Sequence, residues 1–108
     1  MNHTPKQRSA MANAFKLAQE HLGQRDIFIC NALLSVADDN PSLRHSCSLA
    51  SAEVQRRIHP HTAVGGWLSD HCEGFTPEQQ ADYLGVMLEY RKRWLAALVE
   101  EFSKEEAP

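Results

Sequence analysis

The longest run of helical periodicity in the sequence extends from Thr76 to about Ser103, and it constrains the rest of the chain most strongly. Thr76 is a favourable N-cap, Pro77 suits the first helical position, and Gln79 can complete a capping box back to Thr76. The segment therefore predicts a long helix that begins at Thr76. Because acidic residues crowd the negative end of its dipole, this helix is expected to fray after Phe102.

The apolar residues of this segment form two neighbouring stripes when they are placed at about 100° per residue. The first stripe contains Tyr83, Val86, Met87, Tyr90, Trp94, Ala97 and Leu98. The second stripe contains Leu84, Leu88, Leu95, Val99 and Phe102. Together they cover roughly 220° of the circumference, whereas a helix lying on one core needs about 100°. A second covering surface is therefore expected, from other helices of the chain, a second copy or a foreign partner.

Arg91 is a charged residue inside this apolar arc, between Met87, Trp94 and Leu95. Burying its charge without a partner would be costly. Either its stem lies across Trp94 with the head in water, or its guanidinium pairs with a carboxylate across an interface. The residues predicted to bind a partner are Leu84, Leu88, Arg91, Leu95, Val99 and Phe102.

Composition indicates an ordinary globular chain. The 108 residues, 43% hydrophobic and 23% charged, predict one domain over residues 1–108 with frayed ends at 1–8 and 104–108. The net charge of −3 argues mildly against a dedicated nucleic-acid binder. Three cysteines without a C-x-x-C pair argue against a disulfide framework. The sequence has no signal-peptide pattern and no membrane-length apolar run, so a cytoplasmic protein without a membrane partner is expected.

Three further helices are expected before the long one, together with one segment whose type is ambiguous. Ser9 can cap a first helix that ends at Gly23, and a third runs from Ser42 or Ser48 to Ile58 with Glu53 and Arg57 as an i,i+4 pair. A short fourth helix is expected over 62–72.

Residues 27–37 fit a buried helix or a strand, because periodicity does not separate the two in a short apolar run. We favour helix, since the sequence offers no second strand to pair with it. The predicted fold is an all-α bundle of about five helices with a long C-terminal helix.

Residues 51–72, whose first part reads SAEVQRRIHPHTAVGGWL, resemble a helix-turn-helix and offer a DNA-binding alternative. The pattern departs from that motif at Gln55 and His59, and paired glycines occupy the would-be recognition helix. The local charge is nevertheless basic, with Glu53 as the only acidic residue between 41 and 66. The candidate nucleic-acid-binding residues are Arg44, Arg56, Arg57, His59, His61 and Thr62.

A zinc-stabilised binding module is a second alternative, because several possible ligands lie in one third of the chain. These are His45, Cys47, His59, His61, His71 and Cys72. None of the familiar zinc spacings is present, so no metal site and no cofactor are assigned. Asp70, His71 and Cys72 do not form a triad, since adjacent helical side chains do not face each other. With no recognised catalytic motif, a non-enzymatic protein is expected.

The segments RDIFICNALL, VGGWL and YRKRWLAALVEEF together resemble small uncharacterised proteins encoded by phages and prophages, over about residues 25–102. The resemblance implies an accessory protein that acts by binding a host or phage component. The expected function is therefore protein–protein binding, to such a partner or to a second copy, with nucleic acid as the alternative.

Overall fold

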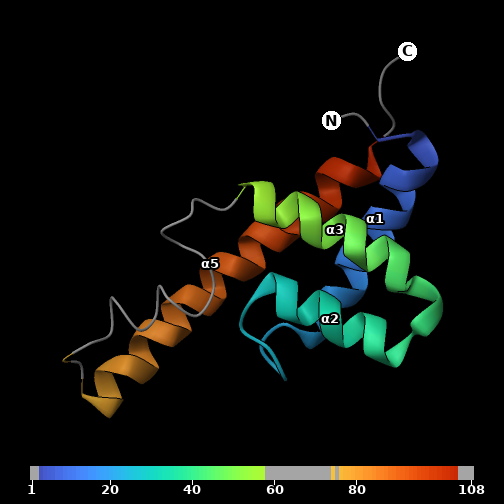
Figure 1. Cartoon of the computed structure of the whole chain (residues 1–108). Coiled ribbons are helices and arrows are strands. Elements are labelled where there is room, and N and C mark those ends of the chain that lie inside the picture. The colour runs from blue at the N-terminus through green and yellow to red at the C-terminus, as the bar shows by residue number, and fades with distance from the viewer. Residues whose placement is uncertain (1–2, 58–73, 75, 105–108) are drawn as a thin grey trace.

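The computed structural model describes residues 3–57, 74 and 76–104 (Figure 1). Within these ranges the chain forms α1 (Pro5–His21), α2 (Ile29–Asp39), the 3₁₀ helix η1 (Pro41–Leu43), α3 (Arg44–Arg57) and α5 (Pro77–Ser103). The described residues contain no β-strand, which confirms the all-α prediction. The helix expected over 62–72, and with it the second half of the helix-turn-helix, lies outside the described residues.

Helix α1 begins at Pro5 with Thr4 as its N-cap, five residues before the predicted N-cap at Ser9. The backbone amide of Gln7 donates to Thr4 Oγ1 at 3.1 Å, and the Thr4 amide donates to Gln7 Oε1 at 2.9 Å. This capping box satisfies two amides that an uncapped helix would leave without partners. The prediction of a frayed segment through residue 8 was therefore wrong from Thr4 onwards. The same Thr-Pro-x-Gln spacing opens α5 at Thr76, as predicted.

Helices α1, α2 and α3 pack together around a core of mostly small and aliphatic side chains. Residues 29–39 are helical, and Ile29, Leu33 and Val36 are buried along one face of α2. The choice of helix over strand for this segment is confirmed. In α3, Val54 is buried, whereas Leu49 is only half-buried because Cys47 and Ala50 face the core.

Helix α5 lies antiparallel along α1 (Figure 1). At one end of the pair, Arg8 Nη2 donates to the backbone carbonyl of Glu101 at 3.0 Å. At the other end the chain turns at Gly23, where an added Cβ would lie 3.3 Å from Leu88 Cδ2. Gly23 also has φ of +92°, a backbone conformation that favours glycine, so this turn is strained with any other residue.

The two antiparallel helices differ greatly in length, since α1 has 17 residues and α5 has 27. At about 1.5 Å per residue, α5 extends roughly 15 Å beyond the end of α1. We call residues 77–90 the projecting half of α5. Figure 1 shows it extending away from the body formed by α1, α2 and α3, and the molecule measures 50 × 28 × 19 Å along its principal axes. None of the helices in the described ranges combines the length and the apolar character needed to cross a membrane.

The paired capping boxes predict different effects of the same substitution at the two helix starts. Thr4→Ala should lower the free energy of unfolding by about 1 kcal/mol, because α1 contributes Met11, Phe15 and Ala18 to the core. Thr76→Ala should leave the urea midpoint almost unchanged and instead speed amide exchange within residues 77–83, because this end of α5 projects from the body. Urea denaturation with hydrogen exchange measures both effects. If both variants lost the same amount of global stability, the prediction that the projecting half of α5 contributes little to it would be contradicted.

Candidate functional site

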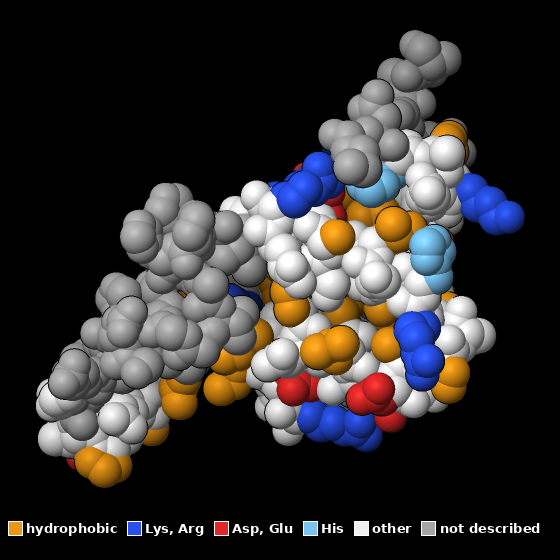
Figure 2. Space-filling view, in the orientation of Figure 1, with side chains coloured by type: hydrophobic (Ala, Val, Ile, Leu, Met, Phe, Trp, Pro, Cys, Tyr) orange, Lys and Arg blue, Asp and Glu red, His pale blue; other side chains and the backbone are white. Residues whose placement is uncertain are grey.

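The first apolar stripe of α5 remains on the surface of the projecting half. Val86 is 69% exposed and Tyr90 64% exposed, one helical turn apart. Tyr83 and Met87 flank them and are half-buried. We call these four residues the outer stripe. In Figure 2 hydrophobic side chains follow the edge of the projecting half of α5, separate from the body.

The second stripe of α5, which contains most of the predicted partner-binding residues, instead packs inward on α1. Leu95 and Phe102 are buried in the core, and Leu88 and Val99 pack against it. Leu84 is half-buried. The prediction that this stripe receives a partner is therefore corrected for the core residues, because intrachain packing already covers them. The apolar side chains of α5 that the described structure leaves most exposed are those of the outer stripe, Val86 and Tyr90.

Arg91, also predicted to bind a partner, is 5% exposed and lies against an aromatic ring. Its guanidinium carbon is 4.5 Å from the centroid of the Phe28 ring, a cation–π distance. Burial lowers the pKa of Arg91. Neither expected arrangement is observed among the described residues, since the head contacts Phe28 rather than bulk water or a carboxylate. This contact joins α5 to the residue that precedes α2.

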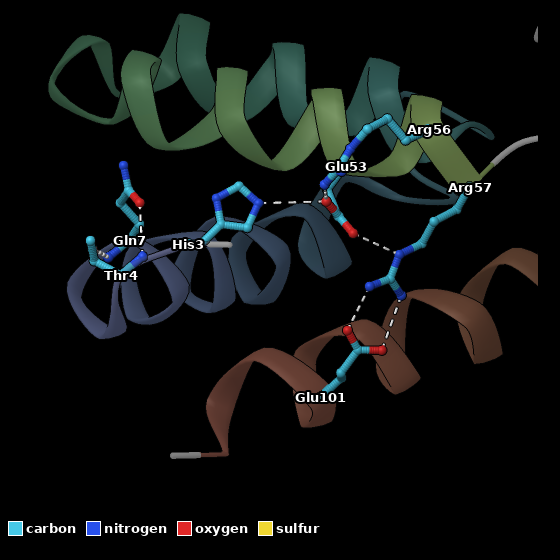
Figure 3. Close-up of polar contacts among 7 residues, drawn as sticks. All are labelled: His3, Thr4, Gln7, Glu53, Arg56, Arg57 and Glu101. Carbon is cyan, nitrogen blue, oxygen red and sulfur yellow. Dashed lines mark hydrogen bonds and ion pairs between the residues drawn. The ribbon is translucent and has the colours of Figure 1, made fainter. Parts of the chain in front are cut away.

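A charged cluster joins α3 to the C-terminal end of α5 (Figure 3). Glu53 is buried on α3, where its Oε1 accepts from Arg57 Nε at 2.9 Å and its Oε2 pairs with Arg56. His3 Nε2 lies 3.6 Å from Glu53 Oε2. The predicted i,i+4 pair is thus confirmed, although the sequence did not indicate that Glu53 is buried.

Arg57 extends this cluster to α5 by a forked contact with Glu101. Its Nη1 and Nη2 donate to Oε1 and Oε2 of Glu101 at 3.0 and 2.6 Å. The hydrogen bonds from Arg57 lower the pKa of Glu101, and those to Glu101 raise the pKa of Arg57. The guanidinium also lies 5.5 Å from the centroid of the buried Phe102 ring. The cluster therefore fastens α5 to α3.

The candidate nucleic-acid-binding residues do not form one basic surface within the described residues. Arg56 and Arg57 pair with carboxylates, which neutralise the charge that phosphate would need. Arg44 is exposed at the opposite end of α3, about 20 Å away at 1.5 Å per residue. His59, His61 and Thr62 lie outside the described residues.

The candidate zinc ligands are only partly described. His45 is exposed on α3, whereas Cys47, two residues later, is buried. Burial raises the pKa of Cys47 and of Cys30, which disfavours the thiolate that metal binding or nucleophilic attack requires. No group of three metal-ligating side chains occurs in the described ranges. His59, His61, His71 and Cys72, and the triad candidates beside them, lie outside these ranges.

An open groove of about 920 Å³ lies between the start of α1 and the end of α5. Its described lining contains four basic residues and no carboxylate: Lys6, Arg8, Lys16 and Lys104. Two of these already have partners, because Arg8 donates to the Glu101 carbonyl and Lys104 Nζ lies 3.6 Å from Glu100. The groove is therefore a weaker candidate binding surface than the outer stripe.

Comparison with known proteins finds no match to this chain among protein-family models, curated proteins or solved structures.

Because one stripe of α5 is buried and the other exposed, truncating a side chain in each should lower the free energy of unfolding by very different amounts. Leu95→Ala removes a fully buried side chain and should lower the free energy of unfolding by about 2–5 kcal/mol. Val86→Ala removes an exposed one and should change it by no more than about 0.5 kcal/mol. Urea denaturation of the two variants at low protein concentration checks this. A large loss in Val86→Ala would mean that the outer stripe is covered within one chain.

The Arg57–Glu101 contact predicts a pH dependence of stability. Because the folded pKa of Glu101 is lowered, its contribution is fully present above the ordinary carboxyl pKa of about 4.3 and is lost as the pH falls through the folded value. The Glu101 side chain is 46% exposed, so solvent screening limits the effect to about 0.2–1 kcal/mol. Glu101→Gln should therefore be less stable than the parent at about pH 7, and the difference should shrink as the pH falls through the lowered folded pKa of Glu101.

Urea midpoints at several pH values measure this difference, and Glu100→Gln is the matched control. Glu100 precedes Glu101, but it is 74% exposed and its partner Lys104 is equally exposed. Its removal should have almost no effect at any pH. A similar pH profile for both variants would show that the forked contact with Arg57 does not stabilise the fold.

Proposed function

We propose that this chain is a non-enzymatic binding protein whose partner contacts lie on the outer stripe of α5. The observation that carries the proposal is the 69% exposure of Val86 and the 64% exposure of Tyr90 on the same face of the projecting half. Neighbouring exposed apolar side chains on a helix are typical of surfaces that another protein covers. Tyrosine suits such a contact, because its ring buries a large area while its hydroxyl still finds a polar partner.

The geometry of the projecting half supports binding to a helix or a groove of a partner. The members of the outer stripe recur at i, i+3, i+4 and i+7, which is the spacing of amphipathic helices in such complexes. This half extends beyond the end of α1, so a partner can approach it without displacing core side chains. The role is the one that the resemblance to small phage proteins implies, an accessory protein that acts by contact.

The DNA-binding and zinc-binding alternatives have less support. The charge of Arg56 and Arg57 is matched by Glu53 and Glu101, and the described cysteine thiols have raised pKa values. Val86 and Tyr90, by contrast, are more than half exposed. Protein binding is therefore the function that the described surface favours.

Photo-cross-linking in the native cell tests the proposal. A benzophenone amino acid at position 90 or 86 should give a covalent adduct with another polypeptide, because the outer stripe is in contact with its partner. The matched control is the same amino acid at Leu34, which is 60% exposed on α2 but has no large exposed apolar neighbour among the described residues. The proposal is falsified if positions 86 and 90 give no more adduct than position 34.

A further inference from the structure

We infer that the occupant of the outer stripe is a second copy of this chain, paired antiparallel through the projecting half of α5. The inference rests on the proposed function, since it assigns the partner of the same surface. It follows from the way in which the charges beside the outer stripe are arranged.

The exposed charges of α5 change sign within residues 77–98, before the acidic pair Glu100 and Glu101 near its end. Glu78, Asp82 and Glu89 lie in the projecting half, and Lys92 and Arg93 follow where α5 meets the body. Two parallel copies would place acidic residues beside acidic residues and basic beside basic. Two antiparallel copies place the acidic end of one against the basic end of the other. Self-pairing in the antiparallel sense is therefore favoured by charge.

Asp82 and Arg93 are positioned to make the two cross-contacts of such a pair. They are eleven residues apart, which is close to three helical turns, so at about 100° per residue they lie within roughly 20° of each other on one flank of the outer stripe. In an antiparallel helix pair, each flank faces the same flank of the other copy. Glu89 pairs with Lys92 at 3.7 Å within its own helix, whereas Arg93 has no ion-pair partner among the described residues.

The centre of this charge pattern coincides with the centre of the outer stripe. The midpoint between Asp82 and Arg93 and the midpoint between Tyr83 and Tyr90 differ by one residue, or about 1.5 Å along the axis. One two-fold axis near Met87 can therefore satisfy both sets of contacts. It would place the aromatic rings of the two copies between two Asp82–Arg93 pairs.

Leu95 and Phe102 hold α1 against the second stripe of α5, so the body formed by α1, α2 and α3 lies beside the outer stripe and not on it. Beyond the outer stripe, Ala97 continues the same face of α5 and is exposed and small, which allows the first turn of the second copy to approach closely. The two bodies then lie at opposite ends of the helix pair.

The interface is short, because each copy contributes about four helical turns. Such a contact falls below the standard interface size of about 1,600 Å². The dimer is therefore expected to dissociate on dilution, and its formation should depend on protein concentration.

Charge reversal in the full chain tests both the partner and the direction of pairing. Sedimentation equilibrium of the parent should show a reversible monomer–dimer system. Asp82→Lys and Arg93→Glu should each raise the dissociation constant at least tenfold, because each places like charges opposite one another twice. An equimolar mixture of the two variants should form a heterodimer with near-parental affinity, because both of its cross-contacts join opposite charges. Glu20→Lys, an exposed residue of α1, reverses the same charge away from the interface and should dimerise like the parent.

Three results would overturn the inference. The first is a parent chain that stays monomeric at all concentrations while circular dichroism shows it folded. The second is single variants that dimerise as well as the parent, which indicates parallel pairing or another surface. The third is a mixture that associates no better than its components.

Failure of the dimer remains distinguishable from failure of the proposed function. A monomeric parent that still cross-links from position 90 to a different polypeptide overturns self-association alone. A monomeric parent with no adduct at positions 86 and 90 overturns both. An adduct of twice the chain mass, together with rescue in the variant mixture, supports both.

Discussion

The ring of Phe102 holds the C-terminal half of α5 in place and thereby fixes the direction of the whole helix. It is buried against Phe15 of α1, with centroids 5.6 Å apart, and the guanidinium groups of Arg8 and Arg57 lie 4.5 and 5.5 Å from its centroid. Aromatic and cation–π contacts of this kind combine apolar burial with a place for charge. Arg57 then pairs with Glu101, so the same site also links α3 to α5. The remaining features of α5 follow from this anchor.

With its C-terminal half anchored, α5 has two environments along one continuous helix. The half beside α1 buries Leu95 and Leu98, and the half beyond it leaves Val86 and Tyr90 on the surface. A single apolar pattern thus supplies core side chains at one end of α5 and exposed apolar side chains at the other. The covering of the exposed end by a second surface stays a prediction.

The sequence predicted the type of each described helix better than it predicted which faces they bury. Capping and periodicity placed the start of α5 at Thr76, and the absence of a second strand decided the helix at 29–39. The same capping signal occurs at Thr4, within a polar segment for which we predicted fraying. Which stripe of α5 faces inward depends on where α1 lies, and local periodicity carries no information about that. The predicted surface therefore fell on core residues such as Leu95.

The two buried charged residues, Glu53 and Arg91, also show that sequence periodicity does not reveal contacts between distant segments. The Glu53–Arg57 pair was predicted, because its spacing along α3 is local. The contact of Arg57 with Glu101 joins positions 44 apart, and the ring that receives Arg91 belongs to Phe28 on another segment. Pairings at such separations leave no periodic mark in one sequence. For this reason the sequence could not show that Arg56 and Arg57, two candidate phosphate-binding residues, are already paired with Glu53 and Glu101.

The pairing of α1 with α5 also determines when the core can be completed during translation. The Arg8–Glu101 contact spans 93 positions, so the apolar face of α1 is fully covered only after α5 has been synthesised. At about 5–20 residues per second, this interval lasts roughly 5–20 s. Helices α2 and α3 can already pack on α1 during that time, but Phe15 must wait for Phe102. The nascent chain therefore passes through a stage in which the unfinished core is most exposed to aggregation or to chaperones.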